Sequence, residues 1–324
     1  MKKVVSVILS GVLALTLLVS CSPAKKNSAG GDTASAESTS SVQTSSGAEP
    51  LLDREGNEIK LPEKMERIIC TAPSNTEILV GLGLGGKLVA ADTYSADVEG
   101  LPSGITMLDF ASPDAEAIIQ LKPDIIIAAG INKAVEGSDP FEQMEKAGIC
   151  VVYVPSSDSV QGICDDITYL SRITGTEETG KKLVDEYSAE VEKIREIGKT
   201  ITEKKKVYFE ISPAPDLYSF GKGTFLNEFI ELMGAENIFG DQEGWVAPSA
   251  EAVLKANPDV ILTNVNYIDN PIDEIKSREG WDTVSAVKNG AVYPVPTNAS
   301  SRPTQLSIQA LKAMAKAVYP EYYE

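Results

Sequence analysis

Short apolar runs rich in β-forming residues alternate with helical patterns along most of the chain. The hydrophobic pattern predicts a helix at 76–82, closed by glycines, and a hairpin at 52–61 around Glu55-Gly56-Asn57. Alternation of strand, helix and strand is typical of an α/β sheet with mainly parallel strands. The predicted strands are 67–71, 87–91, 125–129, 149–154 and 207–211.

Residues 177–201 show a different pattern, that of one long amphipathic helix. Leu183, Tyr187, Val191 and Ile194 recur at steps of three or four residues among many charges. We therefore predict two α/β lobes, each with a mainly parallel central sheet, joined by one long rigid helix. The expected boundaries are 51–175 for the N-terminal lobe, 176–202 for the connecting helix and 203–324 for the C-terminal lobe. A ligand crevice between the lobes is then expected.

The first 50 residues have the composition of a targeting signal and a linker. A basic start at Lys2 and Lys3 precedes an almost wholly apolar run at 4–19, and this run is too short for a comfortable membrane span. Leu18-Val19-Ser20-Cys21 resembles a bacterial lipobox, in which Cys21 becomes the lipidated first residue. We expect a signal peptide over 1–21 and a flexible tether, rich in Ser, Thr, Ala and Gly, over 22–50. Lipid and tether together predict an extracytoplasmic, membrane-anchored protein.

Composition and charge remove several classes of function. The 324 residues include 29 Lys and Arg against 47 Asp and Glu, a formal net charge of −18, and no histidine. The negative balance argues against a nucleic-acid partner. Without histidine there is no Ser-His-Asp or Cys-His machinery and no histidine-ligated metal.

An internal repeat links the two predicted lobes. Residues 116–127 and 251–262 align at a constant offset of 135, each reading as a short helix, a Pro-Asp turn and a buried strand. Good N-cap residues, Asp114 and Ser249, place Glu116 and Glu251 in the first helical turns. Helix-dipole stabilisation explains either glutamate alone. As a pair they would form one face suited to a two-fold partner with paired basic groups.

Aromatic residues stand at equivalent positions of the repeat. Phe110 and Trp245 each lie six residues before the repeat glutamate, in loops rich in Gly, Ser and Asp. Core packing is the alternative interpretation of each residue. Their pairing favours two aromatic side chains that face each other across the crevice.

From Leu51 to Glu324 the chain resembles the solute-binding proteins of ABC importers for iron-siderophore complexes, haem and cobalamin. These proteins have two α/β lobes joined by one rigid helix. The resemblance rests on the order of short motifs over most of the chain. They are Arg67-Ile-Ile, Ala72-Pro-Ser-Asn-Thr-Glu77, Leu82-Gly83, Asp92-Thr-Tyr-Ser95, Leu121-Lys-Pro-Asp-Ile, Gly221-Lys-Gly-Thr224, Met233-Gly-Ala-Glu-Asn-Ile238 and Ser301-Arg-Pro303.

The resemblance implies roles for particular residues. Glu116 and Glu251 match the carboxylates that engage arginines on the two subunits of a permease dimer, which works with ATPase subunits. Tyr94, Phe110 and Trp245 match positions lining the corrinoid cleft of the cobalamin-binding member, where a tryptophan stands at the position of Phe110. The expected ligand is a corrinoid, because flat apolar walls suit a tetrapyrrole-like ring. No cofactor of the protein itself is expected, although the metal-chelate ligand can carry cobalt or iron.

Other ligands and other classes of protein stay open at this point. A ferric siderophore would use Lys222 and Arg302 as charge partners, although Arg302 could equally be structural. A haem ligand could use Tyr94 at its iron. Outside this class, an extracellular two-carboxylate hydrolase is compatible with the many acidic residues. An adhesin would fit the lipid and the tether, but it would not require the repeat.

Overall fold

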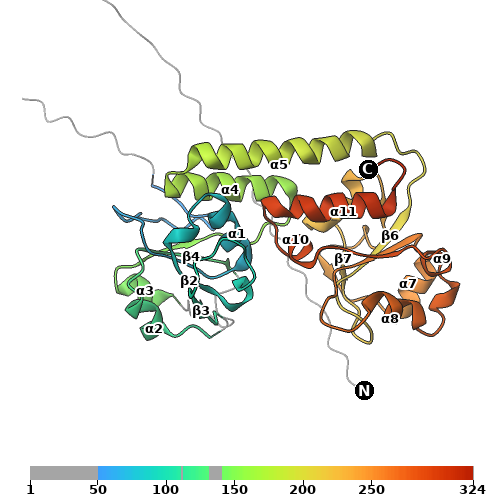
Figure 1. Ribbon diagram of the computed structural model, residues 1–324, viewed down its shortest axis with the longest axis horizontal. Coiled ribbons are helices and arrows are strands. Elements are labelled where there is room, and N and C mark those ends of the chain that lie inside the picture. Colours follow the sequence, from blue (N-terminus) through green and yellow to red (C-terminus); the bar gives the residue numbers. More distant parts are fainter. Residues whose placement is uncertain (1–49, 111, 131–140, 324) are drawn as a thin grey trace, which may run out of the picture. The chain divides into compact units, whose positions relative to one another are not determined.

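The computed structural model of the chain describes residues 50–110, 112–130 and 141–323 (Figure 1). The predicted signal peptide, the lipidation residue Cys21 and all but the last residue of the predicted tether lie outside these residues. By its internal contacts, the segment Glu49–Glu324 forms one compact unit. Within the described part of the chain, no helix has both the length and the apolar character needed to cross a membrane.

The N-terminal lobe is built on a parallel five-stranded sheet of order β3-β2-β1-β4-β5. Its strands are β1 (Ile68–Cys70), β2 (Leu88–Asp92), β3 (Thr106–Leu108), β4 (Ile125–Ala128) and β5 (Cys150–Tyr153). Helices α2 (Ala115–Gln120) and α3 (Glu142–Lys146) lie on one side of this sheet, and α1 (Pro73–Gly81) and α4 (Val160–Thr174) lie on the other (Figure 1). Side chains alternate along each strand, so Ile68 packs toward α1 and α4 while Ile69 packs toward α2 and α3.

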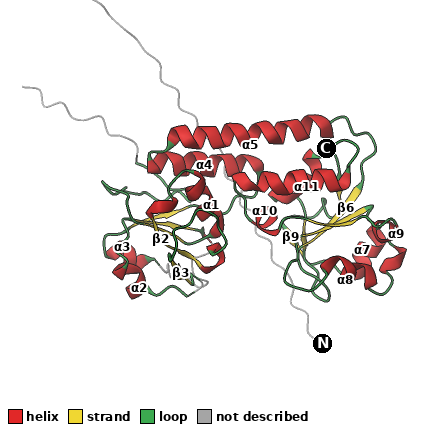
Figure 2. Ribbon diagram, viewed as in Figure 1, coloured by secondary structure: helices red, strands yellow, loops and turns green. Residues whose placement is uncertain are grey.

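The C-terminal lobe has a parallel four-stranded sheet of order β11-β10-β6-β8 and a separate antiparallel ribbon of β7 and β9 (Figure 2). The sheet strands are β6 (Lys206–Glu210), β8 (Glu236–Asn237), β10 (Val260–Thr263) and β11 (Val292–Pro294), and the ribbon strands are β7 (Ser219–Phe220) and β9 (Trp245–Val246). The helices are α6 (Phe225–Leu232), α7 (Ala250–Ala256), α8 (Pro271–Ser277), α9 (Ser285–Lys288), α10 (Thr297–Ser301) and α11 (Ile308–Val318). Short 3-10 turns occur in both halves of the chain. They are η1 (Gly85–Lys87) and η2 (Thr93–Ser95) in the N-terminal half, and η4 (Trp281–Thr283) and η5 (Gln305–Ser307) in the C-terminal half.

The predicted fold class is confirmed, and the long helix is α5 (Glu177–Gly198). The predicted helix at 76–82 begins three residues earlier, at Pro73, because proline is favoured in the first turn of a helix. The hairpin at 52–61 is present only as an isolated antiparallel bridge between Leu52 and Glu58. The ends of the predicted strands differ from the observed ones by at most one residue.

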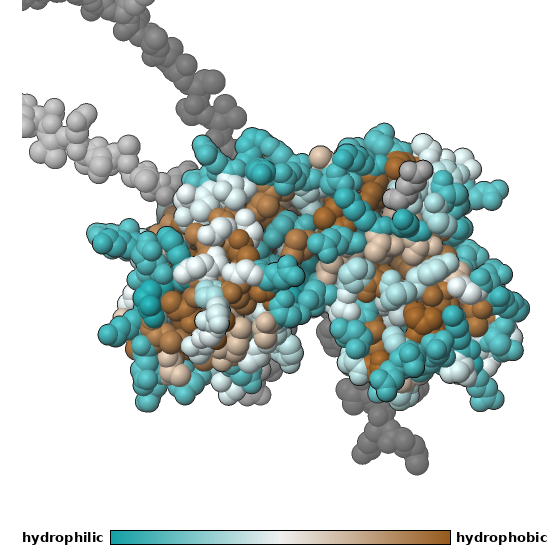
Figure 3. Space-filling view, viewed as in Figure 1, coloured by the Kyte–Doolittle hydropathy of each residue, from teal (hydrophilic) through white to brown (hydrophobic). Residues whose placement is uncertain are grey.

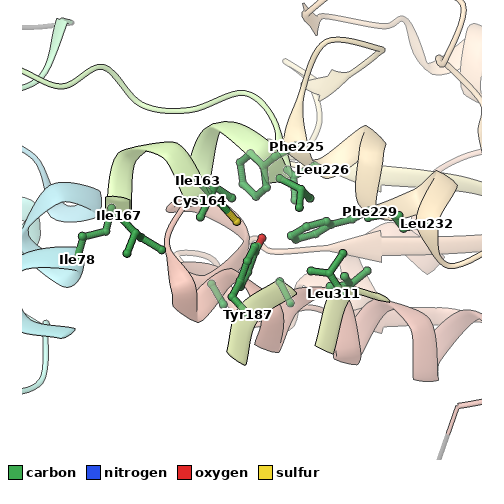
Figure 4. Close-up of a cluster of buried hydrophobic side chains, with 14 of the residues drawn as sticks. Ile78, Ile163, Cys164, Ile167, Tyr187, Phe225, Leu226, Phe229, Leu232 and Leu311 are labelled. Carbon is green, nitrogen blue, oxygen red and sulfur yellow. The ribbon is translucent and has the colours of Figure 1, made fainter. Parts of the chain in front are cut away.

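One hydrophobic core joins the two sheets. It contains Ile68 and Val152 of the first sheet together with Val207 and Leu262 of the second. Between them lie side chains from α4, α5, α6 and α11, which converge in Figure 4 around Tyr187 of α5. Tyr187 is buried, and its hydroxyl shares a hydrogen bond of 3.0 Å with Ser307. The helices that join the lobes are therefore part of a continuous core rather than a bare linker.

The outer side of α5 carries charged residues in pairs one helical turn apart. Lys181 pairs with Asp185 at 2.5 Å and Lys182 with Glu186 at 3.8 Å. Such exposed pairs contribute a few tenths of a kcal/mol each, about 0.3–0.5 kcal/mol. Hydrophilic residues are spread over the face shown in Figure 3, with hydrophobic residues visible between them.

The internal repeat is also a repeat of backbone structure. Lys122 and Asn257, at the same offset of 135, both adopt left-handed conformations, with φ of 48° and 50°. Each Pro-Asp turn then holds the strand beside it: Asp124 accepts from the Arg67 amide at 2.9 Å, and Asp259 accepts from the Lys206 amide at 2.9 Å. The Pro-Asp part of the repeat therefore has a structural role, since it sets the start of β1 and β6.

Candidate functional site

A cavity of about 330 Å³ opens where β1, β2 and β3 end. The carboxyl ends of parallel strands are the usual ligand-binding edge of an α/β sheet. The end of α10 and the two residues that follow it, residues 301–303, close one side of the cavity from the C-terminal half of the chain. Its other walls include Thr71, Ser74, Asp92, Tyr94, Asp109 and Phe110.

Carboxyl groups border this cavity. Asp92 ends β2, is 6% exposed and accepts a hydrogen bond of 2.8 Å from the Tyr94 amide. Burial raises the pKa of Asp92, and the nearby negative charge of Asp109 raises it further, against the amide hydrogen bond that lowers it. The raised pKa favours the neutral form of Asp92, so this carboxyl group is poorly suited to hold a cationic group of a ligand.

The two N-terminal aromatic candidates differ in exposure. Tyr94 lies in η2 and is 77% exposed, so its ring is free to contact a ligand. Phe110 borders the same cavity but is only 2% exposed, and its ring packs at 6.1 Å against Phe141. Most of the Phe110 side chain thus belongs to the core between the sheet, α2 and α3. Its predicted place in a ligand cleft remains a prediction.

Trp245 belongs to an aromatic platform, by which we mean the stacked pair of Tyr218 and Trp245. The two rings lie 6.2 Å apart and 10° from parallel, and Trp245 is 53% exposed. Phe220 of β7 supports the indole edge-on at 6.4 Å and pairs with Trp245 across the ribbon. Because the two short strands hold the indole in place, its exposed face is ready for a flat apolar partner.

Both basic candidates already have acidic partners. Lys222 is half exposed and lies 3.0 Å from Glu243. Arg302 is 8% exposed and pairs with Glu77 and Asp97, each at 2.7 Å. A ligand anion would have to compete with these carboxylates for either charge.

The repeat glutamates are exposed in the first turns of two short helices. Asp114 caps α2 by accepting from the Ala117 amide at 3.1 Å, and Ser249 caps α7 in the same way at 3.2 Å. Glu116 and Glu251 follow these caps. Hydrogen bonds from its own backbone amide and from Ser249 lower the pKa of Glu251, so its carboxylate is charged and available at neutral pH.

The sequence pattern does not single out the exposed aromatic residues Tyr218 and Tyr267. Tyr218 is 38% exposed and completes the platform, and Tyr267 is 66% exposed in the loop after β10. Tyr218, Phe220 and Trp245 come together through the ribbon, and a strand period of two places Tyr218 and Phe220 on one side. That spacing was visible in the sequence, but the pairing of β7 with β9 was not.

Groups of three or more acidic or cysteine side chains able to hold a metal ion are absent from residues 50–110, 112–130 and 141–323. The cysteines of these ranges, Cys70, Cys150 and Cys164, are free thiols. Burial raises the pKa of Cys70 and of Cys150 to about 11, so these thiols stay neutral and are poor ligands at neutral pH.

Residues 68–299 match the family model described as periplasmic binding protein. The chain is 31% identical over 277 residues to an uncharacterized ABC transporter substrate-binding lipoprotein of Bacillus subtilis, covering 84% of this chain and 86% of the relative. A vitamin B12-binding protein of Vibrio campbellii is 30% identical over 76% of this chain and 86% of its own length. A solved structure of a possible iron-binding protein from Staphylococcus epidermidis is 33% identical, with a TM-score of 0.70 over 79% of this chain and all of the other.

Proposed function

The chain belongs to the periplasmic binding protein family and is a substrate-binding protein of an ABC transporter, and from this premise we propose that its cargo is a corrinoid such as cobalamin. The observation that carries the proposal is the solvent-exposed aromatic platform of Tyr218 and Trp245. The similarity to a vitamin B12-binding protein supports the same ligand.

A corrin ring suits the exposed groups of the site better than an anionic chelate does. Its broad, largely apolar surface can cover an indole and a phenol ring, and aromatic contacts of this kind are favourable beyond the area that they bury. Tyr94, with most of its ring exposed, offers a second aromatic contact at the cavity. In this binding mode the ligand needs no cation from the protein.

A ferric siderophore is the second candidate. The observation in its favour is that Lys222 keeps half of its side chain exposed and could leave Glu243 for an anionic ligand. The similarity to a possible iron-binding protein is compatible with it. Against it stand the acidic groups at the cavity and the engagement of Arg302 by two carboxylates. Haem is a further outcome of the test, with the Tyr94 hydroxyl as the candidate iron ligand.

Substrate-binding proteins of ABC transporters work with a permease and an ATPase. We propose that Glu116 and Glu251 are the contacts of this chain with a permease dimer. Both are exposed at capped helix starts that are equivalent in the two lobes. Two equivalent carboxylates fit a partner whose own contacts are related by two-fold symmetry.

We also propose that Cys21 is lipidated and anchors the protein outside the cytoplasmic membrane. The basic start, the apolar run and the small residues before Cys21 support this proposal. Fractionation of cells provides the test, because Cys21→Ser protein should be lost from the membrane fraction. Retention of the variant in that fraction would contradict lipid anchoring at Cys21.

Tryptophan fluorescence tests the ligand directly. The chain has two tryptophans, and Trp281 is 1% exposed beneath the Arg278 guanidinium at 4.6 Å. Trp245 is therefore the tryptophan that a bound ring can contact, and contact with the ring is expected to quench it the more strongly. Full-length protein in mild detergent is titrated with cobalamin, with ferric siderophores and with haemin, each against free tryptophan to correct for absorption by the ligand.

Saturable quenching by cobalamin is the expected result. Quenching by a siderophore alone would transfer the assignment to iron uptake and give Lys222 a ligand-binding role. Quenching by haemin alone would direct attention to Tyr94. If none of the three quenches Trp245, the platform is not the ligand contact and the corrinoid proposal fails.

A further inference from the structure

Arg302 directly follows α10 in the C-terminal half of the chain. Its guanidinium makes three hydrogen bonds to the N-terminal lobe. Nη1 donates to Glu77 Oε1 at 2.7 Å, while Nη2 donates to Asp97 Oδ1 at 2.7 Å and to the carbonyl oxygen of Tyr94 at 2.9 Å. All three acceptors belong to the N-terminal lobe. The side chain is therefore committed to a contact between parts of the chain far apart in sequence.

Neighbours of Arg302 complete the same contact. Thr304 donates to the second carboxylate oxygen of Glu77 at 2.8 Å, and the side-chain amide of Gln305 donates to the backbone carbonyl of Glu77 at 3.0 Å. Asn298 donates to the second oxygen of Asp97 at 2.6 Å. Glu77 is 5% exposed and Thr304 is fully buried. A buried carboxylate whose oxygens are all engaged gives this contact one preferred geometry.

Both polar backbone groups of Tyr94 are hydrogen-bonded. Its amide donates to Asp92 at 2.8 Å, and its carbonyl accepts from Arg302 at 2.9 Å. The ring itself is 77% exposed beside the cavity. Tyr94 thus presents a free aromatic face from a backbone that the other half of the chain helps to hold. Such pre-organisation lowers the entropy that is lost when a ligand binds.

The charge of Arg302 remains in place throughout the working pH range. Burial lowers the pKa of the guanidinium, but the hydrogen bonds and charges of Glu77 and Asp97 outweigh burial and raise it. The two carboxylates compensate this charge, so little of it remains for a ligand.

We infer that Arg302 is a positioning residue, which acts on the ligand through Tyr94 and not through its own charge. The inference rests on the proposed function only in that a ligand contacts Tyr94. It assigns to Arg302 a role different from the siderophore partner expected from the sequence.

The first test needs no ligand. Hydrogen exchange of the full-length protein is compared between the wild type and Arg302→Gln, in a peptide that covers residues 92–98 and in one that covers β6. We expect at least about threefold faster exchange in 92–98 and no change in β6, since loss of a local hydrogen bond favours local opening. Unchanged exchange in 92–98 would overturn the inference, and it would do so whatever the cargo proves to be.

The second test is a double-mutant cycle on affinity, using whichever of cobalamin, ferric siderophore or haemin the wild type binds. Arg302→Gln alone should weaken binding about fivefold, and it should add less than about twofold in a Tyr94→Ala background, because residues that act as a unit are not additive. Losses that multiply in the double variant would show that Arg302 contacts the ligand independently. Failure of the wild type to bind cobalamin would instead count against the corrinoid proposal alone.

Two further variants protect the test against misfolding and charge effects. Asp97→Asn perturbs Arg302 from a partner whose side chain is 55% exposed, and its smaller loss of affinity should also vanish in the Tyr94→Ala background. Arg195→Gln removes an arginine from the exposed pair with Glu192 on α5 and should leave affinity unchanged. Arg302→Lys keeps the charge but lacks the planar fork, so wild-type affinity in this variant would overturn the inference.

Discussion

Affinity for cobalamin should fall at least about tenfold when Trp245 is replaced by alanine. The exposed half of the indole offers apolar area to the ligand. At about 25 cal/mol per Å², roughly 60–80 Å² of covered area is equivalent to about 1.5–2 kcal/mol, which is a factor of about 10–30 in Kd. Removal of the indole also removes the ring on which Tyr218 stacks, so the phenol ring that remains is less well held.

Isothermal titration calorimetry or equilibrium dialysis is the suitable measurement, because the substitution removes the fluorescent reporter. Trp245→Phe keeps a flat ring and should lose only part of the affinity. Tyr322→Ala is the matched control, since Tyr322 is a comparably exposed aromatic residue near the C-terminus. Wild-type affinity in Trp245→Ala would remove the platform from the binding site.

Uptake of labelled cobalamin should collapse, at least about tenfold, in the Glu116→Ala, Glu251→Ala double variant, while affinity for the ligand stays that of the wild type. Loss of one partner of an interfacial charge pair costs about 2–5 kcal/mol where the pair is buried on docking. Both carboxylates are exposed in the free protein, so their removal leaves no unpaired buried group within it. Each single variant should retain part of the uptake.

The assay uses cells that lack their own copy of the protein and carry its cognate permease. Glu178→Ala, Glu186→Ala is the matched control, because it removes two exposed glutamates from α5. Ligand binding lost together with uptake would place the repeat glutamates in the cleft. Normal uptake in the Glu116→Ala, Glu251→Ala variant would place docking on another surface.

The fold class was accessible from sequence because its signals are local. Apolar runs predicted β1, β2, β4, β5 and β6, and the repeat predicted β10, but the short strands β3, β8 and β11 were not predicted. Periodicity predicted α5 to within three residues of its observed end. The repeat also gave both helix caps correctly, since Asp114 and Ser249 act within three residues of themselves. Such features depend on neighbours along the chain.

The parts of the site that escaped prediction depend on contacts between distant residues. The loop composition around Phe110 suggested exposure, yet its ring packs on Phe141, which immediately precedes α3 and lies thirty-one residues later. Nothing near Trp245 in the sequence announces Tyr218 as its stacking partner. The engagement of Arg302 by Glu77 spans more than two hundred residues and appears only once both lobes are folded.

The core shared by the two sheets couples the folding of one lobe to the folding of the other. A chain whose halves bury their apolar surface in common is expected to melt in a single cooperative step. A half-assembled form, with one lobe ordered and the other open, would leave much of that core in water and is therefore rare. The protein is therefore expected either fully folded, with both lobes able to act together, or fully unfolded, and seldom with one working lobe alone.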